Sequence, residues 1–331
     1  MKRAGHLIEK IAELDNLCLA FTKARRGKQR KAEVLAFGEN FEVNIAQMRR
    51  EILDGTIAVG EYRYFTIHDP KERIISAAPF RERVLQHAIM NVCHDHFDRM
   101  LISTTYASRK GKGVYAALDK AVEAASHYAY LVKLDYRKHF DTIDHEVLKQ
   151  RLCRMFKDKA LLTLFFRIID SYCVEEGKGL PIGNLTSQYF ANLYLSDLDH
   201  MAKEQWKADV YIRYMDDILL AGNDKAALRR CVDLMTDYST RELKLTFKPP
   251  VFRRSADGQV FLGYRVLPHH CKLSGRSKKR FRTKLLKYNG LLDDGKWSEG
   301  QYLEHIQPLL SFTLHAESRQ FRLACLEIDR S

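Results

Sequence analysis

The chain has 331 residues, of which 46% are hydrophobic and 29% are charged. This composition is typical of globular proteins and excludes an intrinsically disordered chain. Lys and Arg together number 55, against 42 Asp and Glu, which gives a formal net charge of +13. Such an excess of positive charge favours a polyanionic partner, and nucleic acid is the leading candidate.

The sequence favours a cytoplasmic protein with no membrane partner. No run of residues approaches the roughly 18 apolar positions that cross a bilayer. The start, MKRAGHLIEKIAEL, has the pattern of an amphipathic helix rather than a signal-peptide core. The seven cysteines are scattered without a C-x-x-C pair, which predicts reduced thiols. The clusters CHDH (93–96) and HHC (269–271) lack the spacing of a zinc site.

The first sixty residues predict two helices that flank a basic loop, residues 22–33. The second helix covers residues 41–55 and ends at Gly55. The loop either contacts a polyanion or is only solvated, as charge runs often are. Its cations are Lys23, Arg25, Arg26, Lys28, Arg30 and Lys31.

Residues 61–92 predict a strand, a turn at Asp69–Pro70, a second strand and a helix from about Phe80. Lys71 and Arg73 lie at the tip of this hairpin. From residue 130 the pattern is strand, helix, loop, helix and hairpin. It continues with a helix at 224–241 and a strand pair ending in VFLGYRVL, before the last fifty or so residues, which are helical and basic at their start. This order predicts an α+β fold.

The segment VYIRYMDDILLAG (210–222) places Asp216 and Asp217 inside an apolar run. Two adjacent carboxylates are costly to desolvate and repel each other. If the flanking residues are the arms of a tight hairpin, the pair lies at its tip and can hold a divalent cation. The alternative is a polar turn between core strands, because Asp is common in turns.

A two-metal site requires further carboxylates from other elements. Asp135 ends the apolar strand YLVKL, from which its side chain can project at the same sheet edge as the hairpin tip. Asp141 and Asp144 compete for this role. Asp144 precedes HEVL and fits a helix N-cap, which is a sufficient structural function, so we favour Asp135.

These motifs together resemble the ordered series of reverse transcriptases. Asp135 with Phe140 comes first, followed by the loop GLPIGNLTSQ, then YMDD, then FLGY. The order and spacing of all four are more specific than any one of them, and the resemblance covers residues 60–270. It implies a right-hand polymerase, with N-terminal helices and fingers at 1–129, a palm at 130–271 and a basic helical thumb at 272–331. Within the palm, residues 175–200 form a loop and helix that contact the fingers.

The loop narrows the resemblance, because Ile182 precedes Gly183 and Gln188 follows Ser187, where retroviral and intron enzymes typically have Gln and Pro. With YASRKGKG (106–113), this resembles the reverse transcriptases of diversity-generating retroelements of phages and bacteria. The resemblance implies an RNA-directed DNA polymerase of the bacterial cytoplasm that copies template RNA into cDNA mutated at adenines. Its partners would be template RNA, RNA/DNA hybrid, dNTPs and a basic oligomeric accessory protein. The alternatives are a retron, abortive-infection or intron-type enzyme, or a non-catalytic RNA-binding scaffold.

The resemblance also implies residue roles. Asp135, Asp216 and Asp217, with the backbone carbonyl of Tyr136, would hold two Mg²⁺, for which Mn²⁺ is a possible substitute. Phe140 would exclude a 2′-hydroxyl, unless it is only a core aromatic. Lys71 and Arg73 would bind the triphosphate. The alternative is that they are only solvent-exposed side chains at the tip of a hairpin.

Ile182, Gly183 and Gln188 would lie against the incoming nucleotide, and the loss of a polar contact at Ile182 suggests weakened fidelity. Leu262, Gly263 and Tyr264 resemble the primer grip, for which a strand with a glycine bulge is the alternative. Cations in two segments would contact nucleic acid. They are Arg109, Lys110 and Lys112 in the first segment, and Lys278, Lys279, Arg280, Arg282 and Lys284 in the second.

Overall fold

The computed structural model of the chain describes residues 3–68 and 72–327. Contacts between residues divide the chain into two compact units, each built from three stretches of sequence. The first unit comprises residues 1–103, 136–201 and 235–246, and the second comprises 104–135, 202–234 and 247–331.

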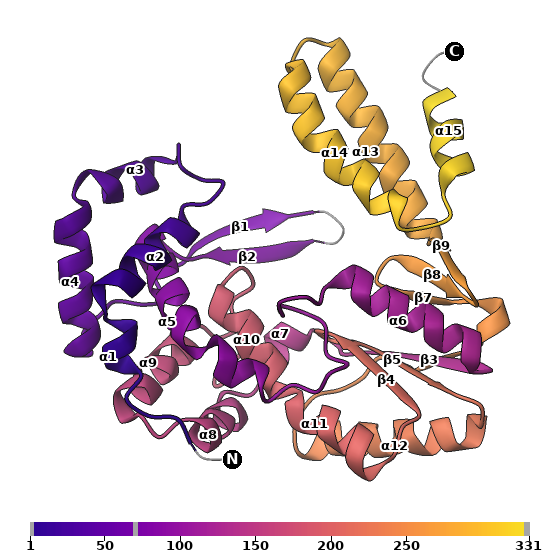
Figure 1. The fold of residues 1–331 in the computed structure, drawn as a ribbon, viewed down its shortest axis with the longest axis horizontal. Helices are drawn as coiled ribbons and strands as arrows, with labels where there is room; N and C mark the ends of the chain where they lie inside the picture. The colour runs from indigo at the N-terminus through magenta and orange to yellow at the C-terminus, as the bar shows by residue number, and fades with distance from the viewer. Residues whose placement is uncertain (1–2, 69–71, 328–331) are drawn as a thin grey trace. The chain divides into compact units, whose positions relative to one another are not determined.

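The first unit is mostly helical (Figure 1). Residues 3–53 form four helices, so the prediction of two was wrong: α1 (Ile8–Ile11), α2 (Leu14–Ala24), α3 (Ala32–Glu39) and α4 (Phe41–Leu53). Helix α3 forms because Val34 and Phe37, one turn apart, are both buried. Phe37 packs on Phe21 and Phe80, with ring centroids 5.5 and 5.4 Å away. The basic loop is therefore limited to residues 25–31.

The predicted hairpin and helix of residues 61–92 are confirmed. Strands β1 (Arg63–Ile67) and β2 (Arg73–Ala77) pair antiparallel, and α5 (Phe80–Asp98) follows. The turn between the strands lies outside the described residues. The remaining helices of this unit are α7 (His139–Thr142), α8 (His145–Met155), α9 (Lys159–Asp170), α10 (Leu185–Tyr194), α11 (Ser196–His200) and the last part of α12 (Lys225–Arg241).

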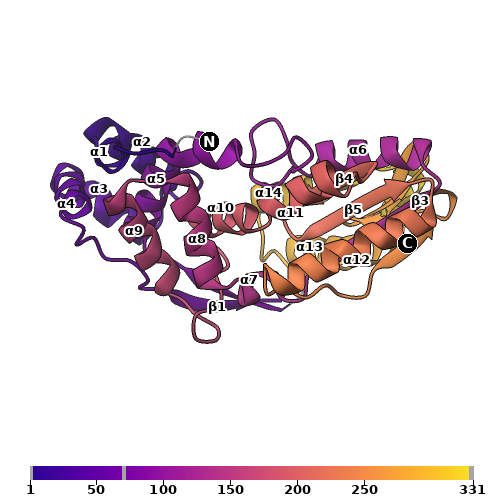
Figure 2. The ribbon, with the colours of Figure 1, turned by 90° about the horizontal axis from the view of Figure 1, so that it is seen from below.

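The second unit is built on a four-stranded antiparallel sheet in the order β4-β5-β3-β6. Its strands are β3 (Tyr130–Asp135), β4 (Val210–Tyr214), β5 (Asp217–Gly222) and β6 (Val251–Arg254). Helix α6 (Val114–His127) lies along one face, and α12 lies along the other (Figure 2). Leu131, Leu219 and Ala221 are buried against α6. Asp135 and Asp217 continue the same face at the end of the strands, because side chains alternate along a strand.

The same core includes the inner face of a second sheet, formed by β7 (Gln259–Phe261), β8 (Tyr264–Leu267) and β9 (His270–Leu273). Two short helical turns, Met201–Gln205 and Ser255–Asp257, precede β4 and β7. The chain continues into α13 (Gly275–Asp293), α14 (Glu299–Leu314) and α15 (Arg319–Glu327). Helices α13 and α14 run side by side (Figure 1). Phe281, Leu285 and Ile306 are buried between them and α15.

The predicted α+β class with antiparallel sheets is confirmed. Every helix within residues 3–68 and 72–327 is too short or too polar to span a bilayer.

Candidate active site

Asp216 and Asp217 lie at the tip of the predicted hairpin. Strands β4 and β5 are joined by Met215 and Asp216, and Tyr214 pairs with Asp217 across this two-residue turn. Met215 has a φ of 56°, which is rare outside glycine and persists only where the surroundings enforce it. Arg213 is fully buried and donates from Nη1 to the Met215 carbonyl at 3.0 Å. A buried guanidinium therefore helps to fix the turn that presents the carboxylates.

Strand register brings Asp135 directly opposite Asp217 on the neighbouring strand. Side chains paired in this way point to the same face, with Cβ atoms about 4.5 to 5.5 Å apart. Two like charges in such a position repel each other. Residues 135 and 217, which are 82 positions apart in the sequence, thus form one acidic pair at the end of the sheet.

Each of these carboxylates is paired with a lysine. Lys133 Nζ lies 2.8 Å from Asp217 Oδ1, and Lys248 Nζ lies 2.7 Å from Asp135 Oδ2. The Asp side chains are only 28% and 27% exposed. Burial raises the pKa of Asp217, Lys133 opposes that rise, and the negative charges of Asp216 and Asp135 add to it. The net effect is a raised pKa, so the folded protein disfavours the ionised form of the Asp217 side chain.

The donors fit a divalent cation in part. Carboxylate oxygens are the ligands that Mg²⁺ prefers, and Asp135 and Asp217 supply them from one sheet face. Across residues 3–68 and 72–327, no three or more His, Cys, Asp or Glu side chains gather closely enough to hold a metal ion. The acidic pair is therefore a partial ligand set.

Asp144 is a helix N-cap, as predicted. Its Oδ1 accepts a hydrogen bond from the Val147 amide at 3.0 Å, and its Oδ2 lies 2.7 Å from Lys244 Nζ. Partial burial alone would raise the pKa of Asp144, but these two contacts outweigh it and lower the pKa. Asp141 lies in the short helix α7. Tyr136 is fully buried, and its hydroxyl lies 2.8 Å from Ser239 Oγ.

Several predicted nucleotide contacts belong to the first unit. Arg73 is exposed at the start of β2, whereas Lys71 lies outside the described residues. Phe140 lies in α7 and is partly buried, and its carbonyl accepts a hydrogen bond from the Leu180 amide at 2.8 Å. The ring of His139 meets it edge-on, with centroids 5.7 Å apart.

The loop before α10 is attached to strand β2. The Ile182 carbonyl accepts a hydrogen bond from the Ser76 amide at 3.0 Å. Gly183 has a φ of 120°, and a Cβ there would lie 3.1 Å from Ile75 Cγ2, so both conformation and space favour glycine. The structure thus brings Ile182 and Gly183 beside the strand that begins at Arg73. Gln188 is exposed on α10.

The predicted primer-grip segment is a tight hairpin turn, not a strand with a glycine bulge. Leu262 and Gly263 connect β7 to β8, with φ of 50° and 88°. Positive φ at both central residues is typical of a type I′ turn. The Gly263 carbonyl accepts a hydrogen bond from Ser277 Oγ at 2.6 Å, and the buried Tyr264 donates to the Phe312 carbonyl at 2.6 Å. The turn is therefore anchored to α13 and α14.

The three cations near residue 110 differ in their surroundings. Arg109 Nη1 donates to the Thr105 carbonyl at 3.1 Å, and Lys112 Nζ lies 5.0 Å from the centre of the Tyr106 ring. Lys110 is exposed. The segment itself is tied to the edge of β4, because the Tyr106 amide donates to the Arg213 carbonyl at 2.9 Å.

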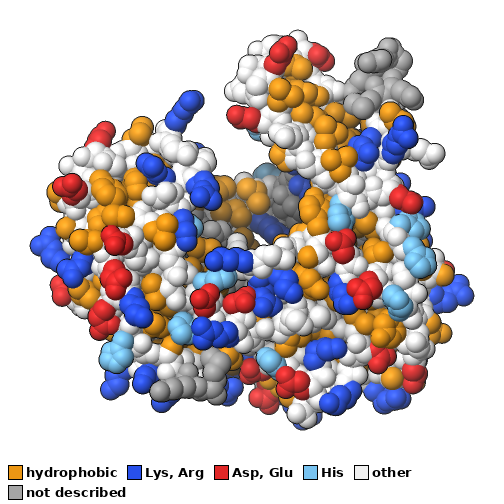
Figure 3. Space-filling view, in the orientation of Figure 1, with side chains coloured by type: hydrophobic (Ala, Val, Ile, Leu, Met, Phe, Trp, Pro, Cys, Tyr) orange, Lys and Arg blue, Asp and Glu red, His pale blue; other side chains and the backbone are white. Residues whose placement is uncertain are grey.

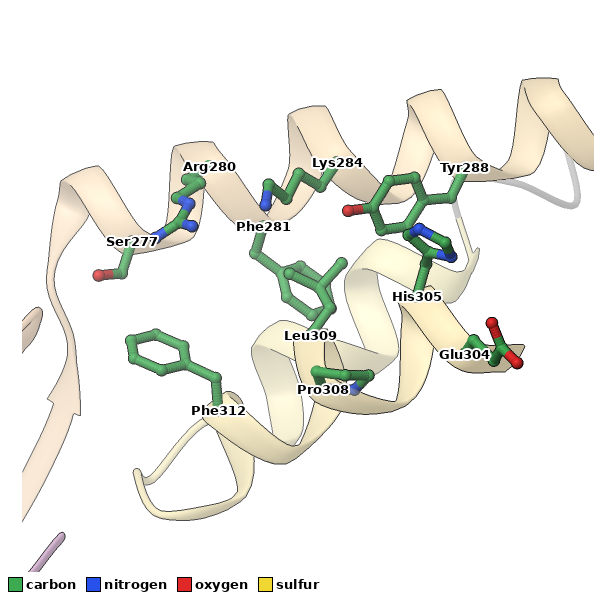
Figure 4. Close-up of a pocket in the computed structure, with 10 residues that line it drawn as sticks. All are labelled: Ser277, Arg280, Phe281, Lys284, Tyr288, Glu304, His305, Pro308, Leu309 and Phe312. Atoms are coloured by element: carbon green, nitrogen blue, oxygen red, sulfur yellow. The ribbon is translucent and has the colours of Figure 1, made fainter. Parts of the chain in front are cut away.

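Four of the five predicted cations of α13 lie in pairs in two different surroundings. Lys278 and Arg282 lie over the ring of Phe321, at 5.6 and 5.2 Å from its centre. Arg280 and Lys284 line a groove of about 400 Å³ between α13 and α14 (Figure 4). Lys279 is exposed.

The groove also has an aromatic wall. Tyr288 and His305 lie together at one end, with centroids 5.7 Å apart, and Phe312 lies at the other end (Figure 4). Figure 3 shows hydrophobic side chains gathered over α13 and α14. Each helix carries an exposed leucine, since Leu286 of α13 and Leu303 of α14 are 57% and 60% exposed. Cations beside aromatic rings are the combination that binds single-stranded nucleic acid.

The basic N-terminal segment is partly engaged within its own unit. Lys23 Nζ lies 2.5 Å from Asn91 Oδ1, and the Arg25 guanidinium lies 5.2 Å from the Phe21 ring centre. The pKa of Lys28 is lowered mainly by burial and, to a smaller extent, by the positive charge of the nearby Arg83. Its predicted contact with a polyanion stays a prediction.

Sequence reasoning missed Lys133, Lys248 and Arg213. The position of Lys133 could have been predicted from the sequence, because a residue two positions before Asp135 on the same strand lies on the same face of the sheet. Lys248 had none, since it is 113 residues from Asp135 in the sequence. The contact of Arg213 with the Met215 carbonyl depends on the turn geometry, which the pattern does not specify.

The chain belongs to the reverse transcriptase (RNA-dependent DNA polymerase) family, whose profile matches residues 68–266, more than half of the sequence. The predicted enzyme class, an RNA-directed DNA polymerase and hence a nucleotidyltransferase, is confirmed at the level of the family.

Relatives include Protein YkfC of Escherichia coli, 22% identical over 68% of this chain and 71% of its own length. The Retron Ec73 reverse transcriptase of Escherichia coli is 25% identical over 51% of this chain and 52% of its own length. The group II intron-encoded protein LtrA of Lactococcus lactis is 22% identical over 48% of this chain and 28% of its own length. The chain spans only a quarter of the putative COX1/OXI3 intron 1 protein of Saccharomyces cerevisiae, a further relative.

A solved structure shows the same fold. Telomerase from Candida tropicalis, in complex with a fragment of telomeric RNA, has a TM-score of 0.50 at 14% identity. The match covers 82% of this chain and 56% of that one. The predicted right-hand polymerase fold is thereby confirmed.

Proposed function

We propose that this chain polymerises DNA on an RNA template, with Asp135, Asp216 and Asp217 as its catalytic carboxylates. The observation that carries the proposal is the register that sets Asp135 opposite Asp217, next to the turn that holds Asp216. Two-metal catalysis of phosphoryl transfer uses carboxylates from separate elements, and β3 and the β4–β5 hairpin would supply them in this chain.

The three carboxylates and the Tyr136 carbonyl would hold two Mg²⁺, with Mn²⁺ as a possible substitute. Bound Mg²⁺ lowers the pKa of a primer 3′-hydroxyl and offsets the charge that develops on pyrophosphate. Lys133 keeps Asp217 oriented and favours its ionised form. Lys248 orients Asp135 through an ion pair and also donates its backbone amide to the Asp135 carbonyl at 2.8 Å.

Nucleotide selection would fall to residues of the first unit. Phe140 would exclude the 2′-hydroxyl of an rNTP, and the loop at Ile182 would lie against the incoming nucleotide. Because Ile182 offers no polar side-chain contact to the sugar, we propose that discrimination is weaker than a Gln at this position would give, by roughly tenfold to two-hundredfold. The full proposed set is Lys71, Arg73, Phe140, Ile182, Gly183 and Gln188.

The domain assignment is also part of the proposal: fingers at 1–129, palm at 130–271 and thumb at 272–331. The Leu262–Gly263 turn and Tyr264 would position the primer end. Template RNA and the RNA/DNA hybrid would contact the cations of residues 109–112 and of α13 through their phosphates.

The motif LPIGNLTSQ supports the finer proposal that the enzyme serves a diversity-generating retroelement in a bacterial or phage-infected cell. It would make adenine-mutagenised cDNA with a basic oligomeric accessory protein. The retron and group II intron relatives favour a second candidate, a reverse transcriptase of one of those lineages. A non-catalytic RNA-binding scaffold is the third.

The test is Mg²⁺-dependent primer extension on an RNA template, followed by sequencing of the cDNA, with Asp216→Asn as the inactive control. Errors concentrated opposite template adenines would support the diversity-generating type. Faithful or evenly scattered copying would favour a retron or intron lineage. No extension, even with cellular cofactors added, would favour the scaffold. Ile182→Gln with an unchanged error rate would contradict the fidelity proposal.

A further inference from the structure

The second unit has a basic cavity whose lining includes Lys278, already proposed to contact nucleic acid, together with three cations that have no role so far, Arg253, Arg265 and Lys272. It measures about 740 Å³ and lies where β3, β6 and the β7–β9 sheet meet the start of α13. None of its lining residues, all in the described part of the chain, is Asp or Glu. Its five cations are Lys133, Arg253, Arg265, Lys272 and Lys278.

The register of the two sheets gathers these cations. Val260, Arg265 and Lys272 pair across β7, β8 and β9, so their side chains share the exposed face of that sheet. In the larger sheet, Leu131 pairs with Arg253 on β6, and Lys133 lies two residues along from Leu131. Lys133 and Arg253 therefore share one face.

The start of α13 completes the cavity wall. Ser274 caps the helix, accepting a hydrogen bond from the Ser277 amide at 3.1 Å, and Gly275 and Lys278 line the cavity. A helix N-terminus adds a partial positive charge. Gly258 leaves room for the guanidinium, because a Cβ there would lie 2.9 Å from Arg265 Nε.

Most of this positive charge is not neutralised by the contacts that the cations make. Arg265 donates to the neutral main-chain oxygen of Asp257, and Lys278 lies over the Phe321 ring. The Asp257 carboxylate is paired with Arg254, and the charges of Arg253 and Arg265 also help to lower its pKa, so it offsets part of the positive charge of these two cavity residues. Of the five cations that line the cavity, all within the described residues, Lys133 forms an ion pair, and its partner is Asp217.

We propose that this cavity binds the sugar-phosphate backbone of a nucleic-acid strand without reading its bases. A volume of about 740 Å³ lies in the range of ordinary ligand sites, about 300 to 1,000 Å³. Its lining contains no aromatic ring on which a base could stack. It differs in this from the α13–α14 groove, which has Tyr288 and Phe312. Phosphate contacts carry no sequence information, so binding here is independent of sequence.

Nucleic acid is favoured over an acidic protein because the chain belongs to a family of nucleic-acid polymerases. In this respect the inference rests on the proposed function. It adds to that function a backbone contact through Arg253, Arg265 and Lys272, beside β6, and the motif resemblance assigned none of these three residues.

The test compares Arg253→Ala/Lys272→Ala with a charge-matched control, Lys225→Ala/Arg230→Ala on α12. Lys133 is left unchanged because it pairs with Asp217. Dissociation constants of an RNA/DNA hybrid and of single-stranded RNA, each in two unrelated sequences, are measured between 50 and 200 mM salt without divalent metal. Equal melting temperatures for the variants and the wild type, and recovery of binding by Arg253→Lys/Lys272→Arg, exclude misfolding as the cause.

Losing two phosphate contacts should reduce the slope of log K against log salt by about 1.8 for a duplex or about 1.4 for a single strand. If the contacts are fully screened at 1 M, the same relation gives roughly 25- to 60-fold weaker binding at 0.1 M salt. The control should leave slope and affinity unchanged, and the effect should be equal for both sequences.

An unchanged slope would overturn the inference, and so would a loss confined to one sequence. Loss of poly-glutamate binding with nucleic-acid binding intact would also overturn it, in favour of an acidic protein. Binding and extension separate the two claims. If the slope falls but the wild type extends no primer, the proposed function fails alone; if the wild type extends but the slope is unchanged, this inference fails alone.

Discussion

At the scale of single residues, the charge balance around Asp217 determines both stability and chemistry. Its carboxylate is mostly buried opposite Asp135, and Lys133 offsets only part of the cost. Removing the charge should therefore stabilise the fold while it disables the site. Arg213 contributes differently, by holding the turn that carries Asp216.

We expect Asp217→Asn to melt about 1 °C higher than the wild type at neutral pH, a change below about 1 kcal/mol for a chain of this size. The folded pKa of Asp217 is raised, so the native state loses stability as the pH rises from the unfolded carboxyl pKa through the folded one. The gain should disappear at pH values below the ordinary carboxyl range. Melting curves across pH test this, and a lower melting temperature at neutral pH would contradict it.

For Arg213→Lys we expect a lower rate constant for nucleotide addition with little change in the KM for dNTP, because the turn is loosened while the nucleotide contacts are kept. The lysine keeps the charge but cannot reproduce the planar fork. Loss of a buried hydrogen bond should also cost about 1 to 3 kcal/mol of unfolding free energy. Arg230→Lys on the exposed face of α12 is the control. Wild-type kinetics and stability in Arg213→Lys would refute a positioning role.

At the scale of elements, caps and turns hold the site's surroundings in place. Asp144 begins α8, and the Leu262–Gly263 turn is attached to the first turn of α13 through Ser277. Asp144 should therefore affect folding more than chemistry, whereas the turn, which is proposed above to position the primer end, should affect folding as well.

Asp144→Ala removes an N-cap and should cost about 1 kcal/mol, which is about 1 to 2 °C in melting temperature. Extension at a temperature where the variant stays folded should match the wild type, because Asp144 is structural. Asp141→Ala is the matched control and should change stability less. Abolished extension in a folded Asp144→Ala would return this residue to the list of metal ligands.

Gly263→Ala should destabilise the chain by more than about 1 kcal/mol, because an L residue is strained at a φ of 88°. The new Cβ would also lie 3.2 Å from Phe312 Cζ and Ser277 Oγ. Gly275→Ala, whose Cβ would meet nothing within 4 Å, should be neutral or slightly stabilising. Denaturant unfolding of the two variants measures the difference, and equal stabilities would contradict the turn assignment.

At the scale of the whole molecule, the sequence predicted the fold class, the hairpin that carries YMDD and the cap at Asp144. Alternating apolar residues and turn signals are local, so they can be read without a structure. The pairing of Asp135 with Asp217 and the meeting of Lys248 with Asp135 depend on register and long-range packing. Helix α3 was not predicted because its formation depends on the burial of Phe37 against Phe21 and Phe80. The helix propensity of its residues alone does not indicate it.

The most direct test of the central claim is single-nucleotide incorporation on an RNA template, measured against Mg²⁺ concentration. Wild type is compared with Asp135→Asn and Asp216→Asn, and Asp144→Ala serves as the control. If these carboxylates hold Mg²⁺ as proposed, the bound metal would stabilise several kcal/mol of transition-state charge, so each Asn variant should lose at least about a hundredfold in rate. The control should keep its rate. Near-wild-type incorporation by a folded Asp135→Asn or Asp216→Asn would contradict the assignment of this carboxylate set.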